Sequence, residues 1–195
     1  DEHNATFEKT FAIAVENVDE PPVITQGAGP LNKNVLEDGT ATWVSSELNA
    51  TDVDVGDILT WSVSSPAANG AATVSGAGAS PTAFSYAPNA DFNGSDSFEV
   101  EVSDGGLTDT ITVNVIVSQV DDGPVVGNEL EDVEVNEDAA DSTIDLANVF
   151  NDVDDANASI TKTAASSDPS LVTVTVSGDT LTLDYLADQT GDANV

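Results

Sequence analysis

The chain contains no cysteine and only one histidine, His3, among its 195 residues. Without cysteine there are no disulfides, no thiolate metal sites and no cysteine nucleophile, and a single histidine leaves little for general base work near neutral pH. Zinc and copper sites, which are built mainly from these two residue types, are therefore not expected. We predict that the protein is not an enzyme.

Basic residues are scarce as well: three Lys and Arg stand against 36 Asp and Glu, which gives a formal net charge of -33. Such a chain repels nucleic acid and anionic membrane surfaces, and cations are its natural partners. No apolar run approaches the roughly 18 residues of a membrane span, so we expect no membrane insertion. The hydrophobic share of 39%, much of it Val, Ile and Leu, nevertheless predicts folded cores rather than disorder.

Apolar and polar residues alternate over short runs that are separated by Gly, Pro, Asn and Asp. This is the period of half-buried strands, and it predicts an all-β protein with at most a turn of helix near residues 45–49 and 146–150. A Ser-Gly-Asp-Thr turn at 177–180 predicts a hairpin. The expected inward rows are Phe11, Ile13 and Val15; Leu59, Trp61 and Val63; Phe98, Val100 and Val102; Ile111, Val113, Val115 and Val117; and, across the hairpin, Val172, Val174 and Val176 facing Leu181, Leu183 and Tyr185.

An internal repeat organises the chain. The string VDEPPV at 18–23 returns as VDDGPV at 120–125, and the DVD at 52–54 returns at 152–154. Glu37 and Asp38 likewise return as Glu137 and Asp138, and Tyr86 as Tyr185. The period of about 97 to 102 residues is the size of one small β-sandwich.

The repeat predicts where the domains lie. Residues 1–17 match the last strand of a preceding repeat, 18–22 form a linker, 23–120 form a complete sandwich, and 121–195 form the first part of a second, truncated one. The chain is therefore expected to be part of a longer protein. Because residues 5–16 match the strand that follows in a complete repeat, one molecule's amino-terminal strand is a candidate to pair with a neighbour's unfinished sandwich.

Acidic residues recur in register with the repeat. They lie in the linkers (Asp19 and Glu20; Asp121 and Asp122), in the two DxD loops (Asp52 and Asp54; Asp152 and Asp154), and at expected strand ends (Glu37, Asp104 and Glu137). Calcium takes six to eight oxygen ligands, so a site needs carboxylates that converge from several segments. Solvated surface loops are the alternative interpretation, but recurrence in register favours calcium.

Several stretches resemble a known family. NGSDSFEVEVSDGG at 93–106, SDPSLVTVTVSGDTLTLDY at 167–185 and FAIAVENVDEPPV at 11–23 are similar to the bacterial cadherin-like and dystroglycan-type cadherin-like tandem repeats of large cell-surface adhesins. The resemblance covers essentially the whole chain. It implies tandem Greek-key sandwiches, of the cadherin or immunoglobulin-like kind, with calcium at the junctions.

The resemblance also implies the calcium ligands. For the first junction they are Asn17, Asp19, Asp52, Asp54 and Asp104. For the second they are Glu37, Gln119, Asp121, Asp152 and Asp154, with Asp122 beside them in the linker. The family's Asp-Arg-Glu triplet is absent, and Asp91 is the nearest replacement.

The resulting hypothesis is a calcium-binding structural segment of an extracellular bacterial adhesin, stiffened by calcium for cell adhesion or biofilm formation. The alternative is a carbohydrate-binding module that recognises polysaccharide, in which an exposed tryptophan would stack on sugar rings. Alternation with Leu59 and Val63 places Trp61 in a core, whereas Trp43 fits either role. Adhesion between identical repeats on two molecules is a third possibility.

Overall fold

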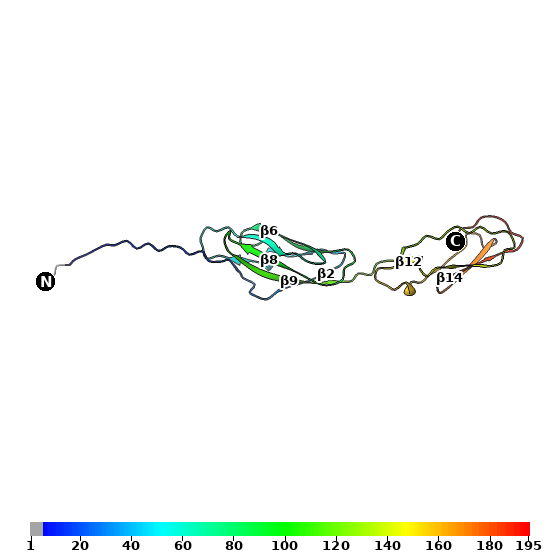
Figure 1. The fold of residues 1–195 in the computed structure, drawn as a ribbon, viewed down its shortest axis with the longest axis horizontal. Helices are drawn as coiled ribbons and strands as arrows, with labels where there is room; N and C mark the ends of the chain where they lie inside the picture. Colours follow the sequence, from blue (N-terminus) through cyan, green and yellow to red (C-terminus); the bar gives the residue numbers. More distant parts are fainter. Residues whose placement is uncertain (1–5) are drawn as a thin grey trace. The chain divides into compact units, whose positions relative to one another are not determined.

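The computed structural model describes residues 6–195, so His3 lies outside the described part of the chain. Two compact units are present, Asp1–Ser118 and Gln119–Val195 (Figure 1). Both are built from strands, and the described helices are two single 3₁₀ turns, Ser45–Glu47 in the first unit and Asn157–Ser159 in the second. The predicted all-β class is confirmed.

The first unit contains a seven-stranded sheet with the strand order β2-β9-β8-β5-β6-β7-β3 and a separate β1-β4 pair. The strands are β1 (Val23–Ile24), β2 (Leu31–Leu36), β3 (Ala41–Thr42), β4 (Ala50–Thr51), β5 (Thr60–Ser65), β6 (Gly70–Ala77), β7 (Ala83–Pro88), β8 (Gly94–Ser103) and β9 (Thr108–Ser118). The sheet closes over itself as an immunoglobulin-like sandwich.

Strand β6 joins the two layers of this sandwich. Its last residues pair with β5, where Gly76 lies opposite Trp61, and residues 70–75 pair with β7. Gly76 has φ +127°, and a Cβ there would lie 2.5 Å from the backbone nitrogen of Thr82. Only glycine fits this bend, which turns the strand from one layer to the other.

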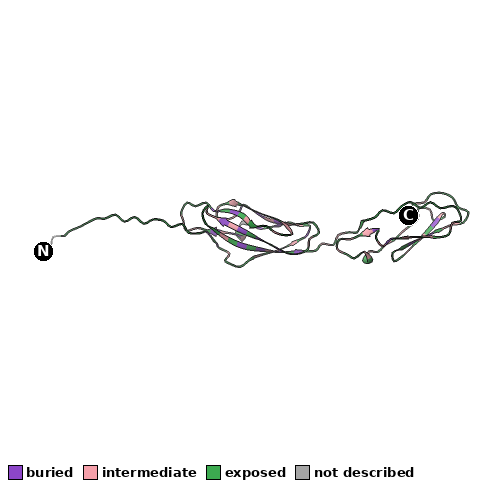
Figure 2. Cartoon of the chain, viewed as in Figure 1, coloured by how far each residue is buried: buried purple, intermediate pink, exposed green. Residues whose placement is uncertain are grey.

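The longest strands, β8 and β9, form an antiparallel hairpin, and β9 also pairs in parallel with β2. Their inward positions supply seven of the buried apolar side chains of this unit, which are Phe98, Val100, Val102, Ile111, Val113, Val115 and Val117. These were the rows expected from alternation, and Figure 2 shows the buried segments along both strands.

Four aromatic rings from the two layers meet in the core. Trp43 stacks on Phe84 with ring centroids 4.2 Å apart, and Phe98 packs edge-on against both. Tyr86 stacks on Phe98 at 6.0 Å. Trp61 is buried nearby and donates its indole N–H to the carbonyl of Gly78 at 2.9 Å. The prediction that Trp61 is a core residue is confirmed, and Trp43 is a core residue too.

The second unit has smaller sheets: a three-stranded sheet with the order β11-β14-β13 and a β10-β12 pair. The strands are β10 (Val125–Val126), β11 (Ser142–Asp145), β12 (Phe150–Asn151), β13 (Val172–Ser177) and β14 (Thr180–Tyr185). The β13-β14 hairpin has the predicted register, with Val172 opposite Tyr185 and Val176 opposite Leu181. The buried core of the second unit consists of Leu146, Val149, Val172, Leu181 and Leu183.

Two expectations from the sequence are wrong. Residues 147–149 form a turn, and the 3₁₀ helix of this unit lies later, at Asn157–Ser159. Phe11, Ile13 and Val15 do not point into a core: their side chains are 78%, 73% and 90% exposed, because residues 6–20 form no strand and have no sheet to pack on. Within residues 6–195, none of the helices has the length and apolar character needed to cross a membrane.

Candidate metal centre

The DxD loop of the first unit follows β4 and is held by its own first carboxylate. Asp52 Oδ1 accepts the backbone N–H of Asp54 at 2.9 Å, an Asx turn that fixes both side chains. Asp54 in turn accepts the side-chain amide of Asn17 at 2.7 Å and the backbone N–H of Glu20 at 2.9 Å. These two hydrogen bonds, the backbone one first, hold the pKa of Asp54 below its usual value. The segment before β1 is thereby tied to the DxD loop.

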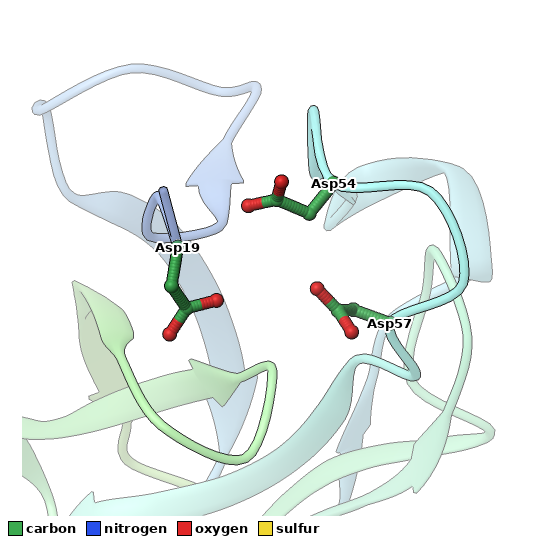
Figure 3. Close-up of side chains that lie close together, drawn as sticks. All are labelled: Asp19, Asp54 and Asp57. Carbon is green, nitrogen blue, oxygen red and sulfur yellow. The ribbon is translucent and has the colours of Figure 1, made fainter. Parts of the chain in front are cut away.

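Three carboxylates converge beside this loop. Asp19, Asp54 and Asp57 each offer an oxygen within 4.8 Å of the others, and their side chains face a common space (Figure 3). Partial desolvation, followed by the charges of Asp104 and Asp54, raises the pKa of Asp19, although the residue is exposed. The pKa of Glu20, also exposed, is raised in the same way, by partial desolvation and then by the charge of Asp54. The cluster therefore concentrates negative charge that a cation would neutralise.

The turn between β8 and β9 brings a further carboxylate to this end of the unit. Asp104 Oδ1 accepts the backbone N–H groups of Gly106 at 2.6 Å and Leu107 at 2.7 Å. A Cβ on Gly106 would lie 3.0 Å from Asp19 Oδ2, so this turn packs closely against Asp19.

Asp52 and Asp104 share an unusual feature. In each, one carboxylate oxygen holds a turn, while the other, Oδ2, is buried without a hydrogen-bond partner among the described residues. A buried carboxylate oxygen without a partner is costly, and a metal ion is one way to satisfy it. The donor set is entirely hard oxygen, which fits calcium and not zinc or copper.

The predicted ligands Glu37 and Asp91 lie elsewhere in the first unit. Glu37 follows β2, is buried, and donates its backbone N–H to the carbonyl of Ser118 at 3.1 Å. Asp91 precedes β8 and is exposed, with a left-handed φ of 58°. Because Asp104 follows the last residue of β8, Asp91 lies at the opposite end of that strand and is not part of the Asp19 cluster.

The second unit repeats the local geometry of the DxD loop. Asp152 Oδ1 accepts the backbone N–H of Asp154 at 2.9 Å, and Asp154 Oδ2 accepts the backbone N–H of Asp122 at 2.7 Å. The Asp122 contact is the counterpart of the one that Glu20 makes to Asp54. Asp121 and Gln119 are exposed in the segment before β10.

Sequence reasoning missed Asp57. Asp57 does not recur in the repeat: the position one hundred residues later is Asn157, whose side-chain amide donates to Asn151. Its place three residues after Asp54 was the available signal, because the loop after the DxD brings the Asp57 carboxylate close to those of Asp54 and Asp19.

The chain was compared with solved structures, curated proteins and protein families. Three solved structures have low similarity: an endo-fucoidan hydrolase of glycoside hydrolase family 107 (18% identity, TM-score 0.43), extracellular cadherin domains 1–5 of protocadherin gamma B2 (14%, 0.40) and a chimeric titin Z1Z2 carrying an exogenous decorin peptide (15%, 0.32). They cover 86%, 88% and 86% of this chain and 24%, 33% and 82% of their own chains. The chain thus spans less than half of the first two, and similarity this low carries no argument about function.

Among curated proteins, no match was found. A family profile described as bacterial Ig domain, by contrast, matches residues 19–116, which begin in the segment before β1 and end in β9. These residues include the DxD loop, Asp57 and Asp104. Because the profile spans half of the 195 residues, the chain belongs to the bacterial Ig domain family.

Proposed function

We propose that the chain is a calcium-binding, non-catalytic structural segment of an extracellular bacterial adhesin, in which bound calcium stiffens the junctions between cadherin-like repeats for cell adhesion or biofilm formation. In this proposal residues 1–17 are the last strand of a preceding repeat, 18–22 a linker, 23–120 a complete repeat and 121–195 the first part of the next. The bacterial surface is the proposed location.

The observation that carries the proposal is the pair of buried, unpartnered oxygens on Asp52 and Asp104. They belong to two segments that are distant in sequence and lie at the same end of the unit as the three converging carboxylates Asp19, Asp54 and Asp57. A solvated acidic loop would have its carboxylate oxygens in water. Carboxylates with buried free oxygens, held in place by backbone turns, are what a calcium site requires before the ion arrives.

The proposed ion would act on the segment before β1. Asn17 and Glu20 already bond Asp54, and Asp19 lies among the carboxylates. When bound, calcium would neutralise the mutual repulsion of these groups and hold the incoming segment, the DxD loop and the β8-β9 turn to one centre. Without it, repulsion between the acids favours separation of the segment from the sandwich. A chain of such units would be stiff with calcium and hinged without it.

Polysaccharide binding, the alternative function, has less support. The chain has two tryptophans, and both Trp43 and Trp61 are buried in the core of the first unit. Neither offers a ring face to a sugar. We therefore favour calcium binding over polysaccharide binding for this segment, and we place recognition of the adhesin's target in other parts of the protein.

Calorimetric titration of calcium into chelator-stripped protein tests the proposal. Wild type should bind saturably, and Asp52→Asn/Asp104→Asn should weaken the site by at least about tenfold, because two anionic ligands are lost. Affinity should also fall from pH 7 to pH 5, since protons compete with calcium for Asp19, whose pKa is raised. Small-angle scattering should show a longer, stiffer particle when calcium is added.

The matched control is Glu99→Gln/Glu101→Gln, which removes the same charge from strand β8 of the same unit at two residues that belong neither to the cluster nor to its turns. It should leave the calcium affinity unchanged apart from weaker long-range attraction. Equal losses in the two double variants, or no saturable heat with wild type, would reduce the cluster to diffuse counter-ion screening and reject the calcium site.

A further inference from the structure

The turn between β8 and β9 is held in place by hydrogen bonds within residues 103–107. The backbone N–H of Asp104 donates to the carbonyl of Leu107 at 3.3 Å, and the Ser103 hydroxyl donates to the same carbonyl at 3.1 Å. The Ser103 hydroxyl oxygen also accepts the backbone N–H of Gly105 at 3.1 Å. Together with the two bonds that Asp104 Oδ1 accepts, these contacts leave the turn little freedom to move away from a neighbouring side chain.

The segment that carries Asp19 is anchored on both sides of that residue. Asn17 donates its side-chain amide to Asp54, and Glu20 donates its backbone N–H to the same carboxylate. The main chain of Asp19 lies between these two anchors, so it too has little freedom to withdraw. The Asp19 carboxylate can give way mainly by rotating about its side-chain bonds, and such a rotation changes its place among the three converging carboxylates.

Gly106 lies where the turn and the segment meet. A Cβ at Gly106 would be 3.0 Å from Asp19 Oδ2, shorter than the roughly 3.5 Å of an unstrained contact, and 3.7 Å from Asp104 Oδ1. The neighbouring Gly105 has φ +113°, a left-handed conformation that favours glycine, whereas the φ of Gly106 lies outside that region. The backbone conformation therefore explains glycine at position 105 but not at 106. The group that a side chain at 106 would disturb most is the Asp19 carboxylate.

We propose that Gly106 is a positioning residue of the calcium site, where the absence of a side chain lets the Asp19 carboxylate lie against the β8-β9 turn. This inference rests on the proposed function, because Gly106 acts only by placing Asp19 and has no side chain to bind an ion. A methyl group at 106 would displace Asp19 Oδ2 by a few tenths of an ångström and weaken it as a ligand. Asp52 and Asp104 would keep their places, since each is fixed by its own turn.

Gly106→Ala changes no charge, which separates its effect from diffuse electrostatics. The long-range attraction of calcium to the unit, and with it the association rate, should stay the same. The loss should fall on the dissociation rate, because one ligand oxygen no longer closes fully on the bound ion. Asp19→Asn removes a negative charge as well as a ligand and should act through both rates. Because the two substitutions act on the same carboxylate, their effects should not add.

Stopped-flow release of calcium to a fluorescent chelator, combined with calorimetric titration of calcium, tests the proposal on the full chain. Gly106→Ala should raise the dissociation rate and weaken calcium binding by about fivefold, and Asp19→Asn should weaken it by about tenfold. The double variant should bind no more weakly than Asp19→Asn alone. The matched control is Gly29→Ala, at an exposed glycine of the same unit where an added Cβ meets no atom within 4 Å. It should leave both rates unchanged.

Urea unfolding without calcium, followed by tryptophan fluorescence, separates positioning from a role in the fold. Gly106→Ala should not lower the stability of the first unit, because alanine fits a backbone conformation outside the left-handed region. A loss of calcium-free stability, an unchanged dissociation rate, or fully additive losses in the double variant would overturn the role of Gly106 while the calcium site stands. An absence of saturable calcium binding by wild type would instead reject the proposed function, and this inference with it.

Discussion

The two units carry the same loop and differ in the core behind it. Each DxD loop is held by an identical Asx turn and by a backbone N–H from the preceding segment. The main sheet of the first unit has seven strands, whereas that of the second unit has three. In the first unit β8 and β9 alone supply more buried apolar side chains than the whole core of the second unit. The difference teaches that loop geometry is local, whereas closure of the sandwich depends on the last hairpin.

That last hairpin also explains why one β2-type segment is a strand and the other is not. Leu31–Leu36 pairs with β9 along its whole length. Residues 131–136 have two valines in the matching positions but have no β9-type partner in their unit, and they remain irregular. A strand at the edge of a sheet gains its hydrogen bonds from its neighbour, so the sequence pattern alone does not make it a strand.

The largest effect is expected from Phe98→Ala. Phe98 contacts Trp43, Phe84 and Tyr86 and joins the two layers of the first unit, so its truncation leaves a cavity and should cost roughly 3 to 5 kcal/mol of unfolding free energy. Both tryptophans lie in this unit, so their fluorescence during urea unfolding follows it alone.

The matched variant is Leu183→Ala in β14, which truncates a buried residue of the smaller core. It should leave the fluorescence transition in place, because the tryptophans do not report on the second unit. A shift of that transition by Leu183→Ala, or a loss below about 1 kcal/mol with Phe98→Ala, would contradict the assignment of separate cores.

A smaller effect is expected from Asp96→Asn, which breaks a buried polar contact found only in the first unit. Asp96 accepts the Tyr86 hydroxyl at 2.8 Å and the backbone N–H groups of Ala68 and Asn69 at 3.1 and 2.9 Å. In the second unit the corresponding tyrosine, Tyr185, bonds the hydroxyl of Ser142 instead. Asparagine has no charge, and its amide nitrogen cannot accept the hydrogen bonds that the second carboxylate oxygen accepts. The substitution should therefore cost about 2 kcal/mol of unfolding free energy.

The pH dependence of the unfolding free energy distinguishes the charge of Asp96 from its contribution to packing. Burial by itself raises the pKa of Asp96, but its hydrogen bonds, led by that from Tyr86, outweigh burial and hold the pKa below its usual value. A carboxyl whose pKa is lowered by folding stabilises the protein above its unfolded pKa of about 3.9, and this stability is lost as the pH falls through the folded value. Asp96→Asn should therefore flatten the acid limb of the fluorescence stability curve; an unchanged limb would assign it to other carboxylates.

What the sequence predicted was mainly local. The β13-β14 hairpin was predicted with its turn and its two facing rows, because a four-residue turn and strict alternation limit both the turn and the register. The bend of β6 at Gly76 and the burial of Asp96 were not predicted, since both depend on segments distant in sequence, the 78–82 turn and Tyr86. Phe11, Ile13 and Val15 were predicted to point inward. Alternation shows which side chains would share a face of a strand, but it does not show whether a neighbouring strand is present to pair with it.

In the candidate site, the repeat identified the acids that recur and overlooked the one that does not. Asp19, Asp52, Asp54 and Asp104 were all expected from the sequence, and the structure brings them to the same end of the first unit. Asp57 was missed because its counterpart is Asn157. Asp91 was added by analogy with a motif that the chain lacks, and it lies at the other end of β8. Which loops meet depends on how the unit folds, and the spacing of the acidic residues in the sequence does not determine it.

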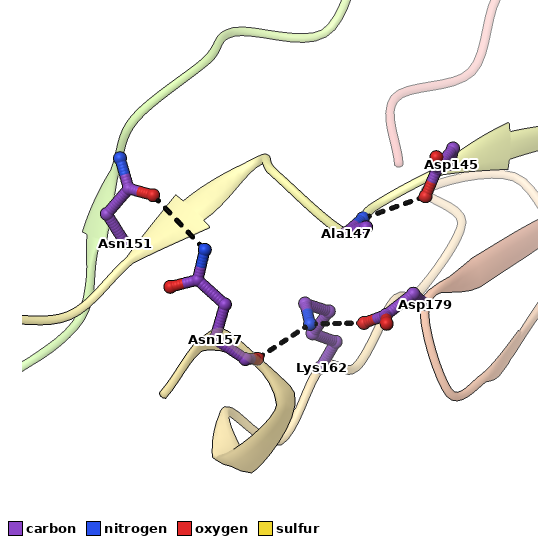
Figure 4. A network of polar contacts seen from close by, with 6 residues as sticks. All are labelled: Asp145, Ala147, Asn151, Asn157, Lys162 and Asp179. Carbon is purple, nitrogen blue, oxygen red and sulfur yellow. Dashed lines mark hydrogen bonds and ion pairs between the residues drawn. The ribbon is translucent and has the colours of Figure 1, made fainter. Parts of the chain in front are cut away.

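The smallest effects compare one ion pair in each unit. Lys162 is 3% exposed and donates to Asp179 at 2.6 Å and to the carbonyl of Asn157 at 3.4 Å, in the network of Figure 4. Lys33 donates to Glu47 at 3.4 Å, and the Lys33 side chain is 29% exposed. Asp179→Asn leaves a buried ammonium without its counter-charge and should destabilise the second unit by about 1 to 2 kcal/mol, whereas Glu47→Gln should cost the first unit less than about 1 kcal/mol. Hydrogen exchange of the β14 amides measures the effect of Asp179→Asn on the second unit, and tryptophan fluorescence measures the effect of Glu47→Gln on the first. Equal losses would show that burial of the lysine does not decide the strength of the pair, and that the smaller core shields its charges from water no better than the surface of the larger one.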